Sequence, residues 1–417
     1  MTRWTTGTLA VLAVLGACGP GRLVRHGTVN EELVTQVGQR LAATRGLNFT
    51  RPVPTRALAP PDVAAAVGDD LTRSFTPGDL NRVEDVYAQV GLVPPGTHLQ
   101  PAMVRVFTTQ LAAFYDPRTG SLAVAMQPVA AGSAASGVLT ALTGRDPVGE
   151  LVVAHELTHA LQDQHWGLPT ESEPLTATNT DRILARRALL EGDATWASFA
   201  TVSGGQLDDA TRARVLGILD ALPGQLAASL PDVPPLLRGT LVFQYRDGTR
   251  FVDLLLARGG WAAVDRAQAD PPISTAQVLH PERYLAAARD MPTPIEVTGT
   301  SSLTRAGFKP VLADTLGEAV IRILARGTLP AERAAQVADG WKGDRLVAFA
   351  RGEEQVVLWM TAWRTTGDAI EFAEALPGIS PGAHVERRGT RVLALSGPWP
   401  RELPAQVWAS RQTEAAR

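Results

Sequence analysis

Apolar residues recur at intervals of three to four positions through most of the chain, the pattern of helices with one buried face. A different pattern in Ala113–Ala125 predicts two strands joined by a tight turn, with Pro117 and Gly120 in turn positions. A Pro-rich segment, Arg51–Asp62, separates the first two predicted helices. The predicted helices cover Val29–Leu41, Asp79–Val90, Met103–Ala113, residues 148–165 and Arg182–Val202, with more to about Ala288.

The pattern changes after Met291–Ser302, a stretch rich in Pro, Thr and Gly that predicts a domain boundary. Beyond it, a helix is followed by strands at Leu346–Ala350 and Gln355–Arg364, a helix at Asp368–Ala375 and a strand at Thr390–Ser396. We therefore expect a mainly helical α+β protein. A larger domain would cover residues 31–298, and a small α+β domain would cover residues 299–417.

Composition excludes several classes of protein. The chain has 417 residues, 45% of them hydrophobic, with 39 basic and 42 acidic residues and a net charge of −3. A chain this apolar and nearly neutral is expected to fold around a core, and it shows no basic footprint for nucleic acid. Its single cysteine, Cys18, excludes a disulfide framework within one chain and any multi-cysteine metal site.

The N-terminus carries the pattern of an export signal. The apolar run Leu9–Leu15 is about half the length of roughly 20 residues that a bilayer span requires. Gly16 and Ala17 precede Cys18, an arrangement that resembles the bacterial lipobox, in which a peptidase cleaves before a lipidated cysteine. We predict a signal peptide over residues 1–17, lipidation of Cys18, a linker over residues 18–30 and a membrane-anchored protein of the cell envelope. The alternative is an ordinary secretory signal that contains a cysteine.

The segment Val152–Leu161 contains the motif HExxH, as His155, Glu156 and His159. Its other residues are uncharged, which predicts a buried helix. Helix positions i and i+4 share a face about 6 Å apart, so both imidazoles can reach one metal ion. Glu156 would project beside that ion and take a proton from its bound water. Neutral imidazoles with an open coordination position suit Zn²⁺, which lowers the pKa of bound water towards about 7.

Two residues compete as the third protein ligand. His165 has the spacing of the pattern HExxHxxGxxH, but Gln162 stands where that pattern has a helix-breaking glycine. If the helix continues, His165 points away from His159. Glu191 follows His159 by 32 residues, on the next predicted helix among apolar neighbours, and Gly192 removes bulk beside it. We favour Glu191.

The chain resembles the zincin-like metallopeptidase family of bacteria and archaea, many of whose members are anchored in the envelope. The resemblance implies a gluzincin-like fold, with zinc on His155, His159 and Glu191 and with Glu156 as base; it implies no substrate. Where some gluzincins have a supporting aspartate, this chain has Thr195, and Asp193 is the candidate for that role. The matching segments are His155–Gln164 (HELTHALQDQ), Leu190–Ala194 (LEGDA), Phe114–Pro117, Ser274–Tyr284 and Gly340–Arg345.

Amide hydrolysis also needs a donor for the oxyanion and a proton for the leaving amine. His280 and Tyr284 are the candidates, because they follow the metal helices as such donors do in other gluzincins. Tyr115 and Tyr245 are weaker candidates. The first strand of the Phe114–Ala125 hairpin is expected to be an edge strand that pairs with extended peptide. The sequence thus predicts a zinc metallopeptidase acting on peptides, with a non-catalytic zinc lipoprotein or a hydrolase of another amide as alternatives.

Overall fold

The computed structural model describes residues 23–414, apart from 26, 60, 67, 69–76, 111, 126–146 and 170–173. The predicted signal peptide and Cys18 lie outside the described residues. The chain forms mixed α+β structure that is mostly helical, with a five-stranded sheet, a three-stranded sheet and a two-stranded ladder among the described residues. This agrees with the predicted α+β class.

The strands are β1 (Val24–Arg25), β2 (Thr28–Val29), β3 (Thr55–Leu58), β4 (Ala113–Asp116), β5 (Ser121–Ala125), β6 (Lys309–Asp314), β7 (Trp341–Arg351), β8 (Glu354–Trp363), β9 (His384–Arg388) and β10 (Arg391–Ser396). The helices are α1 (Glu31–Arg45), α3 (Pro77–Gln89), α4 (Leu99–Gln110), α6 (Pro147–Trp166), η1 (Leu175–Ala177), α7 (Thr180–Val202), α8 (Asp209–Ser229), α9 (Pro235–Val242), η2 (Phe243–Asp247), α10 (Gly248–Ala269), α11 (Thr275–Leu279), α12 (Pro281–Leu285), α13 (Ser301–Arg305), α14 (Gly317–Ala325), α15 (Ala331–Asp339), α16 (Thr366–Ile379) and α17 (Leu403–Glu414).

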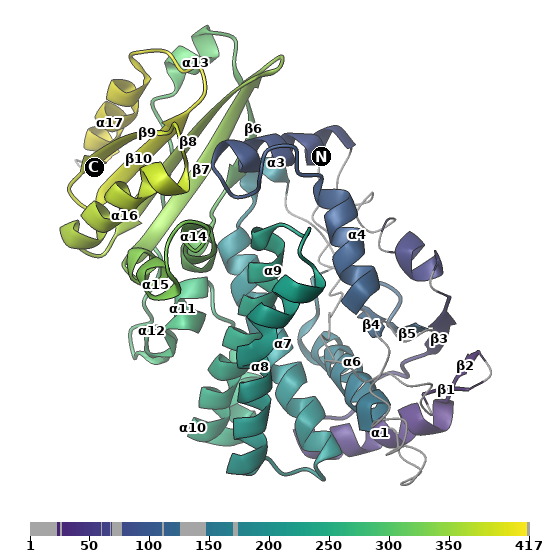
Figure 1. Ribbon diagram of the computed structural model, residues 1–417. Helices are drawn as coiled ribbons and strands as arrows, with labels where there is room; N and C mark the ends of the chain where they lie inside the picture. Colours follow the sequence, from purple (N-terminus) through teal and green to yellow (C-terminus); the bar gives the residue numbers. More distant parts are fainter. Residues whose placement is uncertain are drawn as a thin grey trace.

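Two helices, α6 and α7, occupy the interior of the helical part, where α1, α8 and α10 surround them (Figure 1). A run of thirteen residues of α6, from Gly149 to Gln162 with Leu151 excepted, is buried. This burial explains why α6 lacks a polar face: it packs on α1, α7 and β4 from different sides. The helix therefore presents its few polar side chains to the protein interior.

The three-stranded sheet lies beside α6 and has the order β3-β5-β4. β4 and β5 form the antiparallel hairpin that the sequence predicts, and Tyr115 pairs with Leu122. β4 is an edge of this sheet among the described strands, as expected. Two further features go beyond the sequence expectations. The Pro-rich segment contains β3, which pairs in parallel with β5, and the predicted linker contains the ladder of β1 and β2.

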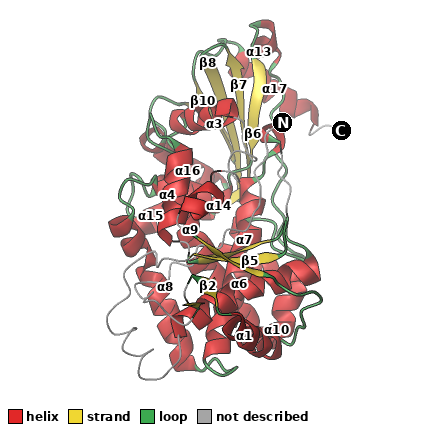
Figure 2. Ribbon diagram, turned by 90° about the vertical axis from the view of Figure 1, so that its right-hand side faces the viewer, coloured by secondary structure: helices red, strands yellow, loops and turns green. Residues whose placement is uncertain are grey.

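The five-stranded sheet forms the opposite end of the elongated molecule (Figure 2). Its strands run antiparallel in the order β6-β7-β8-β10-β9. One face packs on α17 around Leu358, Leu393 and Trp408. The other face carries Trp359 and belongs to the largest hydrophobic cluster of the protein.

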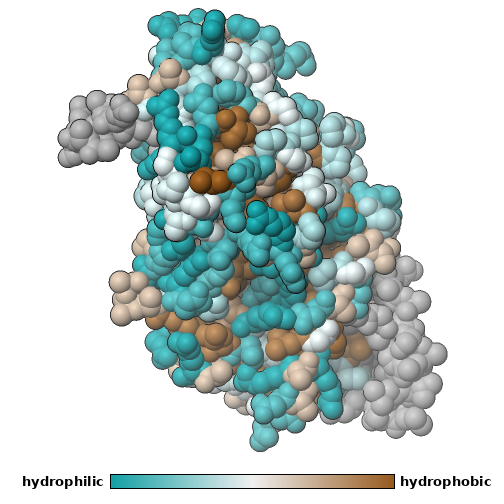
Figure 3. All heavy atoms as spheres, turned by 60° about the vertical axis from the view of Figure 1, so that its left-hand side comes forward, coloured by the Kyte–Doolittle hydropathy of each residue, from teal (hydrophilic) through white to brown (hydrophobic). Residues whose placement is uncertain are grey.

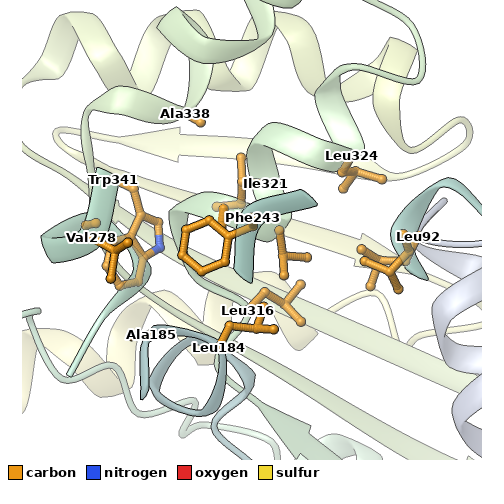
Figure 4. Packing of buried hydrophobic residues seen from close by; sticks show 14 of the residues in the cluster. Leu92, Leu184, Ala185, Phe243, Val278, Leu316, Ile321, Leu324, Ala338 and Trp341 are labelled. Atoms are coloured by element: carbon orange, nitrogen blue, oxygen red, sulfur yellow. The ribbon is translucent and has the colours of Figure 1, made fainter. Parts of the chain in front are cut away.

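That largest cluster joins the two predicted domains instead of stopping at the predicted boundary. Leu184 of α7 and Phe243 of η2 pack in the same cluster as Leu316, Ile321 and Trp341, which follow the boundary (Figure 4). The part of the chain that follows the boundary therefore has no separate core on this face of its sheet. Its strands β6 and β9 extend the sheet beyond the three strands that the sequence predicts.

The described surface carries few large apolar side chains. Ile218, Met291 and Ile370 are exposed, and the hydrophobic areas in Figure 3 are small and separated by hydrophilic ones. No described helix combines the length and the apolar character that a membrane span requires.

Candidate metal centre

The three residues of the HExxH motif are fully buried on α6. The rings of His155 and His159 meet edge to face, with centroids 4.9 Å apart, and their Nε2 atoms are 3.3 Å apart. One helical turn thus directs both Nε2 atoms to the same point, as the spacing predicts.

Glu191 reaches this point from α7, which packs along α6. Its Oε2 atom lies 3.2 Å from Nε2 of His155 and 3.7 Å from Nε2 of His159. One donor atom from each of the three residues lies within 4.8 Å of the others, so this buried cluster could hold a metal ion. His165 lies elsewhere: α6 continues past it, and its Nε2 is 2.9 Å from the carbonyl oxygen of Asn48.

Two glycines allow α7 to carry Glu191 close to the segment that follows α9. A Cβ on Gly192 would lie 2.3 Å from the carbonyl oxygen of Gly248, and a Cβ on Gly248 would lie 2.1 Å from that of Ala188. Both distances are well below van der Waals contact. The absence of a side chain at Gly192 therefore allows α7 to cross the start of α10 closely. This close crossing places η2 beside the cluster of His155, His159 and Glu191.

Gln162 connects the metal cluster to Asp193. Its Oε1 is 2.8 Å from Nδ1 of His159, and its Nε2 donates to Asp193 (3.0 Å) and to the carbonyl oxygen of Leu190 (3.0 Å). Gln162, which stands where the pattern HExxHxxGxxH has glycine, thus orients the ring of His159. Asp193, for which the sequence predicts a supporting role, is linked to His159 through this amide.

Asp193 is itself buried and compensated. Arg45 of α1, also buried, places its Nε 3.0 Å from Asp193, contacts Asp265 at 2.8 Å and stacks over the ring of Trp261. Gln268 donates a further hydrogen bond to Asp193 at 3.0 Å. A fully buried carboxylate therefore has cationic and amide partners, which offset the cost of its desolvation.

Glu156 differs from Glu191 in its partners. Its Oε2 accepts a 2.9 Å hydrogen bond from the backbone N–H of Tyr115 on β4, whereas its Oε1 has no hydrogen-bond partner among the described residues. Burial raises the pKa of Glu156 to about 8. A buried carboxyl with one unpaired oxygen is suited to exchanging a proton with a molecule that enters the site.

The three residues of the cluster influence one another's pKa values. Burial by itself raises the pKa of Glu191, but the neighbouring His159 and His155 lower it to about 2. Burial opposes the charge of His159, yet Glu191 raises the pKa of His159 to about 9. Burial lowers the pKa of His155. The cluster thus contains a carboxylate, and a cation bound there would displace the imidazole proton.

The sequence gives four candidate donors: Tyr115, Tyr245, His280 and Tyr284. Of these, Tyr245 places its side chain against the cluster. Its buried ring stacks against His155, with centroids 6.2 Å apart and an angle of 26° between planes. It lies on η2, a single π-helical turn of the kind that recurs at functional sites. The sequence gives no local signal for this turn. Tyr115 contributes its backbone, and its hydroxyl donates to Asp163.

His280 and Tyr284 form contacts at other places. Nε2 of His280 lies 2.6 Å from Glu318 and 3.1 Å from Asp339. The hydroxyl of Tyr284 donates to the carbonyl oxygen of Asp270. Both residues therefore hold α11 and α12 against their neighbours. Neither side chain contacts His155, His159 or Glu191 in these interactions, so the structure adds no support for the active-site role predicted for them.

Comparison with known proteins gives one match. A family described as a domain of unknown function (DUF8575) matches residues 307–379, which run from β6 into α16 and include none of the metal cluster. No curated protein and no solved structure matches the chain.

Proposed function

We propose that this protein is a zinc-dependent metallopeptidase. The observation that carries the proposal is a buried cluster of His155, His159 and Glu191 with the unpaired carboxyl oxygen of Glu156 beside it. A metal site that served only to stabilise the fold would have no use for this additional buried carboxyl group, whose burial is costly.

The donor set fits zinc. Two imidazole nitrogens and a carboxylate oxygen at zinc bond lengths, in tetrahedral geometry, lie about 3.3–3.6 Å apart. The three separations here are 3.2, 3.3 and 3.7 Å. Three protein ligands also leave one position for water or substrate, as in catalytic zinc sites.

The surrounding residues support peptide hydrolysis. Zinc at this site would polarise the substrate carbonyl and lower the pKa of an attacking water. Glu156 would accept the proton of that water on its free Oε1 and deliver it to the leaving nitrogen. Tyr245 would donate to the developing oxyanion. β4, an edge of its sheet among the described strands, would hold an extended peptide by backbone hydrogen bonds.

The decisive experiment combines metal analysis with one substitution. Purified protein should contain about one zinc per chain, and Glu156→Gln should retain that zinc while losing cleavage of a peptide library by at least a hundredfold. Glu150→Gln is the control, because Glu150 lies on the same helix but is paired with Arg40. Full activity of Glu156→Gln, or release of the metal without loss of activity, would refute the proposal.

The place of action is a separate part of the proposal. We propose that Cys18 is lipidated and anchors the protein in the cell envelope, on the basis of the sequence pattern before it. Cells fed a radioactive fatty acid should label the wild-type chain but not Cys18→Ala, and the variant should leave the membrane fraction. Equal labelling of both chains would contradict the anchor.

A further inference from the structure

Tyr115 of β4 contacts two carboxylates of α6 at once. Its backbone N–H donates to Oε2 of Glu156 at 2.9 Å, and its hydroxyl donates to Oδ2 of Asp163 at 2.7 Å. Glu156 and Asp163 are seven positions apart, which is two helical turns, so they lie on the same face of α6, about 10 Å apart along its axis. One residue of the strand therefore fixes β4 against α6 at two points, and one of these points is the candidate base.

The direction of the Tyr115 N–H follows from its place in the sheet. In an antiparallel pair of strands, residues that bond to each other alternate with residues whose N–H groups point away from the partner strand. Tyr115 lies opposite Leu122 of β5, and the N–H of Leu122 donates to the carbonyl oxygen of Pro54, outside the pair. Both residues are thus of the second kind. Because β4 is an edge strand among the described strands, its outward N–H is available to Glu156.

This N–H determines which oxygen of Glu156 stays available. Oε2 is engaged by Tyr115, whereas Oε1 has no hydrogen-bond partner among the described residues. The two oxygens of a free carboxylate are equivalent, and rotation of the group would exchange them. A group that transfers a proton must be held within about 0.5 Å of its productive position, and a displacement of about 1 Å can cost roughly a hundredfold in rate. The hydrogen bond from β4 therefore restricts the orientation of Glu156.

Asp163 holds the other end of Tyr115 and is itself fixed by two further partners. Its Oδ1 accepts the N–H of Leu168 at 3.1 Å, and Arg51 forms an ion pair with its Oδ2. The side chain of Tyr115 is buried and packs with Leu190 of α7. Burial and the neighbouring Asp163 raise the pKa of the Tyr115 hydroxyl, so this group remains a hydrogen-bond donor to Asp163.

We propose that Asp163 is a positioning residue for peptide hydrolysis, because through the hydroxyl of Tyr115 it holds the backbone N–H that orients Glu156. The proposal rests on the peptidase function proposed above. Asp163 acts from two helical turns away and needs no contact with substrate or metal. Tyr115, which the sequence suggests as a donor to the oxyanion, would then serve the reaction through the base instead.

Tyr115→Phe removes the hydroxyl and keeps the ring and the backbone N–H. The variant should retain about one zinc per chain and the wild-type KM within twofold, while kcat for a cleaved peptide falls at least tenfold. Asp163→Leu should lower kcat by a similar factor, and the double variant should lower it no further, because the two residues act as one unit. A further loss of kcat in the double variant, or an unchanged kcat in Tyr115→Phe, would overturn the proposal.

The matched control is Tyr87→Phe. Tyr87 on α3 is also buried, and its hydroxyl donates to the buried Asp314 at 3.4 Å, so the variant loses the same kind of hydrogen bond. It should keep kcat within twofold. An equal loss of kcat in both phenylalanine variants would overturn the proposal, because the effect would then follow from any lost hydroxyl.

Amide hydrogen exchange tests the contact with Glu156 without any activity. In Tyr115→Phe, the N–H of residue 115 should exchange at least tenfold faster relative to the N–H of Leu122, which donates to Pro54 in the same sheet. An unchanged ratio would overturn the proposal whether or not peptides are cleaved. Faster exchange in a protein whose wild type cleaves no peptide would support the orientation of Glu156 by Asp163 and refute the peptidase function.

Discussion

Replacing Gln162 by methionine tests whether the amide bridge between His159 and Asp193 tunes metal binding. Methionine has a similar size but offers no group to Nδ1 of His159, which Gln162 holds at 2.8 Å. Residues that orient ligand histidines are worth about 10–100-fold in metal affinity. At about 1.4 kcal/mol per tenfold change, the loss of binding free energy is about 1.4–2.8 kcal/mol. The dissociation constant for zinc, measured by competition with a chromophoric chelator, should rise by that factor.

The matched control is Gln268→Met. Gln268 is also buried and also donates to Asp193 at 3.0 Å, but its hydrogen bond does not involve His159. Both variants leave a buried polar group unsatisfied, so each should lose about 1–3 kcal/mol of unfolding free energy without metal. Zinc affinity should fall for Gln162→Met and stay within threefold for Gln268→Met. Equal zinc affinities in the two variants would refute the idea that the bridge acts on the ligand.

Three further predictions concern stability. Gly192→Ala should lower the unfolding free energy by about 3 kcal/mol or more in urea titrations, since its Cβ would meet backbone at 2.3 Å, whereas Gly217→Ala on α8, with open space around it, should be neutral or stabilising. Arg45→Met should cost about 3–5 kcal/mol, because it leaves Asp193 buried without its cation, and a loss below 1 kcal/mol would contradict that role. Burial raises the pKa of Asp181 to about 8, so the protonated group contributes stability that is present below about pH 4 and is lost as pH rises through 8. Asp181→Asn, which resembles the protonated form, should therefore gain stability over the wild type as pH rises from 4 to 9, by about 1 kcal/mol or more, and a constant difference across this range would contradict the raised pKa.

Much of the candidate metal site could be predicted from the sequence, because its signals are local. Spacing of four residues places His155 and His159 on one helix face, and the unbroken helix after Gln162 carries His165 away, as expected. The apolar surroundings of Glu191 correctly indicated a buried carboxylate. The β4–β5 hairpin was predicted from the turn residues Pro117 and Gly120, a signal that involves neighbouring residues alone.

The remaining features depend on contacts between distant residues. Gln162 meets Asp193 across 31 positions, and Tyr245 reaches His155 through a π-turn that no residue pattern announces. β3 has almost no pattern of its own and is a strand because β5 provides a parallel partner. The prediction that His280 is a donor rested on its order along the chain, which does not determine where the residue lies in the folded protein. The predicted boundary near residue 299 is a change in local pattern, and the core crosses it.

Helix α7 connects the shared core to the candidate metal site. Its 23 residues span about 34 Å, with Glu191 near the middle. At its first turn, the N–H of Thr180 donates to Asp314, and the N–H of Asp181 donates to the carbonyl oxygen of Thr315. The end of β6 in the five-stranded sheet therefore fixes the N-terminus of α7, the helix that carries Glu191. Deleting residues 299–417 would release that end and leave Leu184 exposed. The C-terminal part of the chain therefore helps to hold Glu191 in position beside α6, and a fragment that lacks residues 299–417 should not bind metal like the full chain.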